Sequence, residues 1–147
     1  MYQVIVVGTD GSERAGVAVE EALALADMTG AVLHGVHVRR PVLMTGTEHA
    51  DAAAIVASNS DRNVESERIS EEFLVGAERR GVTAEMHTFD GDPADALIRV
   101  AEAVRADLVV VGNRGMSGVR RFVLGSVPNK VAHHCPSSVL IVDTGPG

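Results

Sequence analysis

Cysteine and aromatic residues are scarce in this chain of 147 residues, which contains one Cys, no Trp, one Tyr and three Phe. The single thiol, Cys135, can form no internal disulfide and offers no pair of thiolate ligands, so it favours a reducing compartment over a redox role. Long hydrophobic runs are also missing, since no apolar stretch approaches the roughly 20 residues that span a bilayer. Because Met1 leads straight into an apolar strand pattern without a basic leader, we expect a cytoplasmic protein.

Basic residues are outnumbered, with 13 Lys and Arg against 20 Asp and Glu and a formal net charge of −7. Nucleic acids and anionic membranes are bound through basic surfaces that displace counterions. The composition therefore argues against a general nucleic-acid binder and against a membrane-surface binder. The length and the hydrophobic content of 46% suit one core, so we expect residues 1–147 to form a single domain.

Short strand patterns alternate with longer helical patterns, which is typical of stacked βαβ units. The strand patterns cover residues 4–7, 31–38, 82–89, 108–111 and 139–142. The first, fourth and fifth are almost wholly apolar, as expected of central strands with both faces covered. The third alternates Val82, Ala84 and Met86 with polar residues, which predicts an edge strand.

Cap residues delimit four expected helices. The first begins near Ser12 and ends at Gly30, the second covers residues 61–80, the third opens at Asp92-Pro93 and the fourth follows Gly125-Ser126. In the second helix, the residues expected to face the core are Val64, Ile69, Phe73, Leu74 and Ala77. Residues 40–60 carry the weakest pattern, so we expect a mobile or lid-like insert there, with at most a short helix over residues 47–57.

Two glycine-bearing loops follow apolar strands, GTDGS at residues 8–12 and GNRGMSGVRRFVLGS at residues 112–126. Right-handed crossovers and short connections favour the strand order 3-2-1-4-5 in an open, Rossmann-like parallel α/β sheet with helices on both faces. In this order the first and fourth strands are neighbours, so both loops meet at the topological switch point. Glycines there let backbone N–H groups approach phosphate oxygens, which predicts one nucleotide pocket.

The spacing Gly112-x2-Gly115-x9-Gly125-Ser126 matches the G-x2-G-x9-G-[ST] pattern of the nucleotide-binding universal stress protein family. The GTDGS, DLVVVGNRG and GSVPNKVAHHCPSSVLIV segments also resemble that family, and only residues 40–60 lack recognisable counterparts. The resemblance implies a stress-response module that binds an adenine nucleotide and signals to protein partners. It points first to ATP and leaves AMP and cyclic AMP open.

The glycine pattern also has a physical interpretation. Gly112 and Gly115 are expected to turn the chain and expose amides, while Gly125 and Ser126 lead into a helix whose dipole favours an anion. Ser126 is placed either to cap that helix or to donate its hydroxyl to phosphate. The resemblance implies the second role, together with the amide of Val127.

For the remaining pocket, the resemblance implies that Asp10 accepts hydrogen bonds from ribose hydroxyls and that the backbone of Val38 pairs with the adenine edge. Thr9 and Val111 would complete the pocket. The alternative for Asp10 is an Asx-turn or a cap of the first helix. Mg²⁺ would accompany a triphosphate mainly through its phosphate oxygens, with Asp10 as the one candidate protein ligand.

Charged and metal-binding residue types also occur near the predicted pocket and elsewhere in the chain. Arg114, Arg120 and Arg121 form a basic cluster that either contacts phosphate or faces solvent, and Arg114 is the best candidate for the contact. The run His133-His134-Cys135 is interpreted as a helix end rather than a metal site. His34 and His37 are interpreted as strand residues, with His37 beside the adenine. We expect no metal site.

No catalytic residues are predicted, because the chain has no Walker A loop, no SGGxDS loop and no supported Ser-His-Asp set. At most, weak ATPase activity is expected. Two alternatives stay open: a slow Mg²⁺-dependent ATP hydrolase and a nucleotide-independent dimeric interaction module. The apolar strand 139–142 has no Pro or Lys to block pairing, and the resemblance implies a homodimer through this strand.

Overall fold

The structure is a computed structural model that describes residues 1–39, 52–114 and 124–145. Five parallel strands form one sheet in the order β3-β2-β1-β4-β5, as the sequence predicted. Among the described residues, no helix combines the length and the apolar character needed to cross a membrane. The elements are β1 (Val4–Gly8), α1 (Glu13–Thr29), β2 (Val32–Val38), α2 (Ala52–Arg79), β3 (Ala84–Phe89), α3 (Pro93–Val104), β4 (Leu108–Gly112), α4 (Ser126–His134) and β5 (Ser138–Val142).

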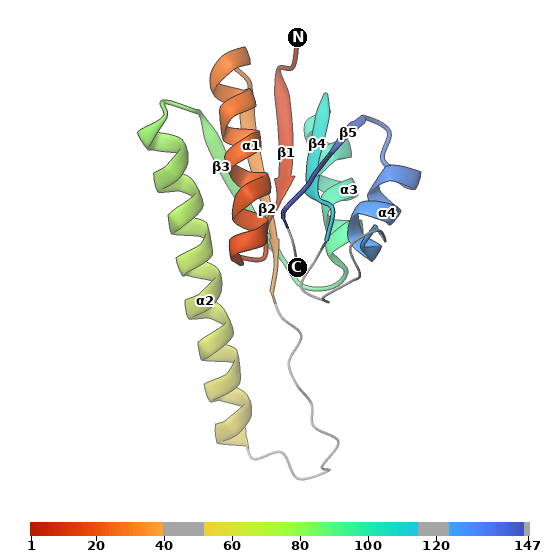
Figure 1. The fold of residues 1–147 in the computed structure, drawn as a ribbon. Coiled ribbons are helices and arrows are strands. Elements are labelled where there is room, and N and C mark those ends of the chain that lie inside the picture. The colour runs from red at the N-terminus through yellow and green to blue at the C-terminus, as the bar shows by residue number, and fades with distance from the viewer. Residues whose placement is uncertain (40–51, 115–123, 146–147) are drawn as a thin grey trace.

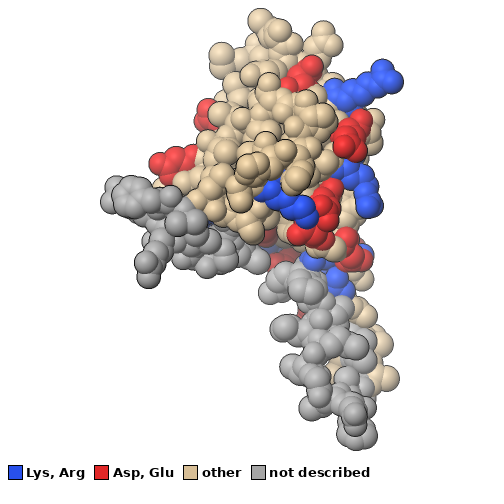
Figure 2. All heavy atoms as spheres, turned by 90° about the vertical axis from the view of Figure 1, so that its right-hand side faces the viewer, with Lys and Arg blue, Asp and Glu red and all other residues tan. Residues whose placement is uncertain are grey.

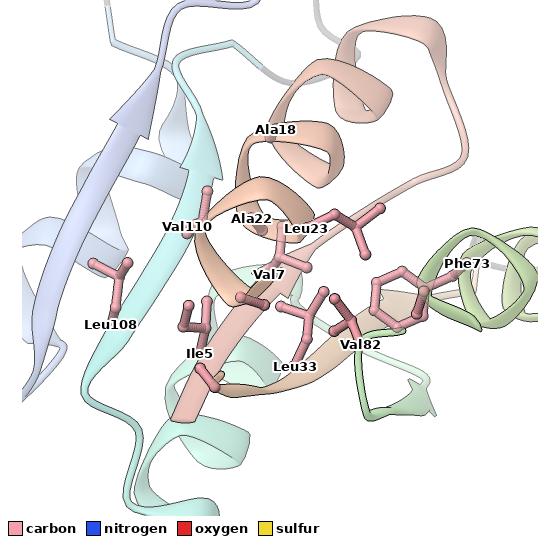
Figure 3. Packing of buried hydrophobic residues seen from close by; sticks show 13 residues of the cluster. Ile5, Val7, Ala18, Ala22, Leu23, Leu33, Phe73, Val82, Leu108 and Val110 are labelled. Atoms are coloured by element: carbon pink, nitrogen blue, oxygen red, sulfur yellow. The ribbon is translucent and has the colours of Figure 1, made fainter. Parts of the chain in front are cut away.

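Helices cover both faces of the sheet, with α1 and α2 on one face and α3 and α4 on the other (Figure 1). Successive strand residues point to opposite faces, so Ile5 and Val7 pack under α1 while Val6 packs against α3. Figure 3 shows Leu33 of β2 and Phe73 of α2 within the hydrophobic core on the α1 and α2 side of the sheet. The sheet therefore has two hydrophobic cores, one on each side.

The central and edge strands differ in burial. Val109, Val110 and Val111 of β4 are all buried, as expected of a central parallel strand. The predicted edge position of β3 is confirmed. As the predicted strand order requires, β5 is the other edge, although its apolar pattern resembles that of a covered strand, and Ile141 is 37% exposed. Its apolar residues are thus left without a neighbouring strand on one side among the described residues.

Helix caps lie where the residue types indicated. Ser12 Oγ accepts a hydrogen bond from the Ala15 N–H at 3.1 Å, and Gly30 ends α1 with a φ of 75°. Asp92 accepts a hydrogen bond from the Asp95 N–H at 2.9 Å and precedes Pro93 in the first turn of α3. These caps fix the directions in which both helices leave the carboxyl edge of the sheet.

The second helix differs from the prediction. It begins at Ala52 rather than at residue 61. Residues 52–60, expected to belong to a mobile or lid-like insert with a short helix within residues 47–57, are part of α2, and residues 40–51 lie outside the described residues. Ile69, Phe73 and Ala77 are buried as expected, whereas Val64 and Leu74 are 63% and 40% exposed. The helix lies over β2 and β3 at one side of the sheet, so only a narrow stripe of it is covered (Figure 1).

Candidate functional site

A cavity of about 490 Å³ lies at the carboxyl ends of β1 and β4, where the strand order reverses direction. Its volume is in the range typical of small-molecule sites. The loop after β1, the end of β2, the loop before α3, the end of β4 and the start of α4 all contribute. The lining residues are Gly8, Thr9, Asp10, Ser12, Ala15, Val36, Val38, Arg39, Gly91, Asp92, Pro93, Leu97, Val111, Gly112, Arg114, Ser126, Val127 and Pro128.

Most of the residues singled out in the sequence lie around this cavity. Among the described residues, Gly125 is the exception: it is buried behind the lining, where its N–H donates to the Asn113 carbonyl oxygen at 2.9 Å. This bond ties the start of α4 to the loop after β4. Gly115, Arg120 and Arg121 lie outside the described residues.

One end of the cavity is apolar. Val36 and Val38 point to the same side of β2 because strand residues alternate, and Leu97 of α3 faces them across the cavity. His37 therefore points to the opposite side of the sheet and is not among the residues that line the cavity, so the expectation that it lines the pocket is wrong. Its buried Nδ1 lies 3.1 Å from the Thr9 carbonyl oxygen, where it supports the loop after β1.

The loop after β1 is held by local hydrogen bonds. The Thr9 N–H donates to the Val36 carbonyl oxygen at 2.9 Å, and Thr9 Oγ1 accepts from the Gly11 N–H at 3.1 Å. Asp10 Oδ1 accepts from the Ser12 N–H at 2.8 Å, which is the Asx-turn considered as its structural role. A carboxylate has about four acceptor positions, so this bond leaves Asp10 able to accept from a ligand as well.

The first turn of α4 borders the other end of the cavity. The N-cap position belongs to Gly125, not to Ser126, and no side chain of the described residues makes a capping hydrogen bond there. By contrast, α1 and α3 are capped by Ser12 and Asp92. The exposed Ser126 hydroxyl and the first-turn amides of α4 are thus available to an anion, which the positive end of the helix dipole also favours.

Arg114 is buried at the same end, with 6% of its surface exposed. One amino group of its guanidinium donates to the Gly145 carbonyl oxygen, which anchors the segment after β5. Its buried Nε has no hydrogen-bond partner among the described residues. An unpaired donor on a buried cation is costly, and an anionic ligand would satisfy it.

Lys130 of α4 pairs with Asp92, which lines the cavity, although 42% of its side chain is exposed. Its Nζ is 2.8 Å from Asp95 Oδ1 and 3.2 Å from Asp92 Oδ2, so it joins α4 to α3. The hydrogen bonds that Lys130 donates to Asp95 and then to Asp92 raise the pKa of Lys130. The Asp95 backbone N–H, followed by Lys130, lowers the pKa of Asp92.

A second ion-pair group extends the rim toward α2. Arg39 at the end of β2 donates through Nε and Nη2 to both oxygens of Asp90, at 2.9 and 2.7 Å, and Arg62 of α2 donates to Asp90 at 3.0 Å. Sequence reasoning missed Arg39 and the Gly91-Asp92-Pro93 segment. Both follow a strand directly, so the rule used for the first and fourth strands would have found them.

A further cavity of about 560 Å³ lies between α2 and the end of β3. Its lining includes the carboxylates Glu67, Glu71 and Glu78, which disfavour a phosphate group. The cavity at the carboxyl ends of β1 and β4 is therefore the better candidate for an anionic ligand.

The family model described as the universal stress protein family matches residues 1–143. Universal stress protein Rv1636 of Mycobacterium tuberculosis is 34% identical over 149 residues, covering 97% of each chain. A universal stress protein solved in complex with cAMP is 36% identical, with a TM-score of 0.73 and coverage of 98% of this chain and 99% of that one. The structure of protein MJ0577 shares the fold, with a TM-score of 0.85, 21% identity and coverage of 100% and 99%.

Proposed function

Because the chain belongs to the universal stress protein family, we propose that it binds an adenine nucleotide in the cavity at the carboxyl ends of β1 and β4 and that the bound state acts as a signal to partner proteins. The observation that carries this proposal is found in one cavity: within the described part of the chain, the start of α4 has no side-chain cap and the Nε of buried Arg114 has no hydrogen-bond partner. The cAMP bound to the 36% identical relative supports the same ligand class.

Each part of the cavity suits one part of such a ligand. The apolar end formed by Val36, Val38 and Val111 would receive the base, with the backbone of Val38 at the adenine edge. Asp10 would accept hydrogen bonds from the ribose. The amides of Gly112 and Val127, the Ser126 hydroxyl and Arg114 would face the phosphates. Gly115 and Gly125 belong to this proposal through the glycine spacing alone.

Among adenine nucleotides we expect ATP to bind most tightly. Several donors gather at the phosphate end, and a triphosphate offers them more acceptor oxygens than a single phosphate does. Mg²⁺ would accompany the triphosphate, with the carboxylate of Asp10 as its candidate protein ligand. Cyclic AMP lacks a free 3′ hydroxyl, so it would give up one hydrogen bond to Asp10.

Calorimetric titration tests this proposal. The protein, freed of co-purifying nucleotide, is titrated with ATP, AMP, cyclic AMP and GTP, with and without Mg²⁺. We expect saturable binding of the adenine nucleotides at one site per chain, with ATP tightest and GTP weaker. If cyclic AMP binds most tightly, cyclic AMP and not ATP is the preferred ligand of the same cavity. Failure of all three adenine nucleotides to bind would refute the proposal.

We also propose a homodimer formed through β5. This edge strand exposes Ile141 and has no Pro or Lys to block pairing with a second copy. Figure 2, which views the molecule from the side of α4 and β5, shows a broad uncharged centre with charged side chains mostly near its margins. We expect the mass of a dimer at micromolar concentration and that of a monomer for Ile141→Lys. A monomeric wild-type protein would refute the dimer.

A further inference from the structure

Two histidines and a glutamate from the neighbouring strands β2 and β3 meet at the β3 edge of the sheet, on the face that α3 and α4 cover. His34 lies on β2, and Glu85 and His87 lie on β3, with His34 paired in register with Glu85. The three side chains offer ligand atoms that all lie within 4.8 Å of one another. None of the three lines the nucleotide cavity. From this geometry we propose that the three side chains bind a divalent metal ion, and that this ion is Zn²⁺.

The spacing of the ligand atoms suits a metal ion. His34 Nδ1 lies 3.0 Å from His87 Nε2 and 3.6 Å from Glu85 Oε2, and His87 Nε2 lies 3.9 Å from Glu85 Oε2. Tetrahedral Zn²⁺ with bonds of about 2.0–2.2 Å holds its ligand atoms roughly 3.3 Å apart. The two nitrogens need to separate by a few tenths of an ångström and the carboxylate needs to move inward. Small side-chain rotations therefore suffice.

The three side chains differ in exposure, which suits a metal site that is held by the sheet and is still open to an ion from solvent. The His34 side chain is 10% exposed, that of His87 29% and that of Glu85 66%. The least exposed ligand is thus held by the sheet, while the most exposed one can adjust to the ion. Two imidazoles and a carboxylate are a ligand set that Zn²⁺ commonly takes, and three protein ligands leave a fourth position for water.

The placement on two strands gives the ion a structural effect. β3 is an edge strand whose one strand neighbour among the described residues is β2. An ion held by His34 on β2 and by Glu85 and His87 on β3 would link these strands. Because it would bind the folded chain and not the unfolded one, it would also raise the unfolding temperature. The proposal of a metal site does not rest on the proposed binding of a nucleotide.

Titration of the chelator-treated protein with Zn²⁺ tests this site. We expect one ion per chain, and a loss of roughly tenfold or more in affinity for Glu85→Gln and for His87→Gln, since each removes a direct ligand. His133→Gln is the matched control, because this exposed histidine on α4 lies outside the cluster. It should bind Zn²⁺ as tightly as the wild type. Circular dichroism checks that each variant is folded, and exposed Glu85 is the substitution least able to disturb folding.

Cobalt gives an independent readout. Co²⁺ in a tetrahedral nitrogen and oxygen site absorbs visible light strongly, so the wild type and His133→Gln should show these bands and His87→Gln should lose them. Stoichiometric Zn²⁺ binding with tetrahedral Co²⁺ bands that depend on Glu85 and His87 would establish the site. The proposal is overturned if the wild type binds no stoichiometric Zn²⁺. It is equally overturned if folded Glu85→Gln and His87→Gln bind the ion as the wild type does.

Discussion

Replacing Arg114 by Met is expected to weaken the binding of phosphorylated adenine nucleotides with little effect on folding. The arginine is 6% exposed, and its buried Nε has no hydrogen-bond partner among the described residues. In the proposed complex that donor faces a phosphate. Methionine has a similar length and no charge, so the variant removes the donor and keeps much of the packing.

The magnitude follows from the type of bond lost. A hydrogen bond between charged partners contributes about 1.5–3 kcal/mol. Since about 1.4 kcal/mol corresponds to a factor of ten, the Kd for ATP should rise roughly ten- to a hundredfold. The substitution also removes the bond to the Gly145 carbonyl oxygen but relieves the cost of burying a charge. We therefore expect the free energy of unfolding to change by no more than about 2 kcal/mol.

The assay is calorimetric titration of the variant and the wild type with ATP, AMP and adenosine. Adenosine has no phosphate, so its affinity should be unchanged. Arg99→Met provides the control, because Arg99 is an exposed arginine of α3 outside the cavity lining. Wild-type affinity for ATP in Arg114→Met, or an equal loss for adenosine and ATP in a folded variant, would refute the assigned role of Arg114.

Three further predictions concern the ribose, the core and acid stability. Asp10→Ala should weaken ATP more than 2′-deoxy-ATP in parallel titrations, and equal losses would leave Asp10 only its bond to the Ser12 N–H. Gly35→Ala should lower the free energy of unfolding in urea by about 1–3 kcal/mol, because its Cβ would lie 2.6 Å from Met86 Sδ and 2.8 Å from the Phe73 ring. The helical control Gly76→Ala, with its nearest contact at 3.8 Å, should instead raise it by roughly 0.5–1 kcal/mol. The Gln3 and Val4 N–H groups donate hydrogen bonds to the Asp107 carboxylate and hold its pKa below the usual 3.8 in the folded chain. The stability that these bonds contribute is therefore present above pH 3.8 and is lost as the pH falls below 3.8. Urea unfolding from pH 5 to pH 2 should show a smaller loss for Asp107→Asn, and identical profiles would contradict this assignment.

The strand order and the location of the cavity could be predicted because they follow from local patterns. Apolar strands alternating with capped helices imply the parallel sheet, and the crossover rules then make β1 and β4 neighbours. The loops that contain Asp10 and Gly112 thus had to meet. Ser12, Gly30 and Asp92 acted as caps for reasons visible in the residue types themselves.

Features that depend on contacts between distant residues were missed. The orientation of His37 follows from which face of β2 the cavity occupies, and the pairing of Lys130 with Asp92 and Asp95 follows from the packing of α4 on α3. The cluster of His34 and His87 joins residues 53 positions apart, so no local spacing marks it. The early start of α2 was hidden by the weak pattern of residues 52–60, although they form helix in the structure.

Backbone amide chemical shifts measured during an ATP titration test the central claim most directly. If the nucleotide occupies the cavity at the carboxyl ends of β1 and β4, the largest shifts will fall on the amides of Thr9, Gly112 and Val127, which line it. Residues of the groove between α2 and β3, such as Glu71 and Glu78, should shift little. An absence of shifts at saturating ATP, or shifts confined to that groove, would contradict the account.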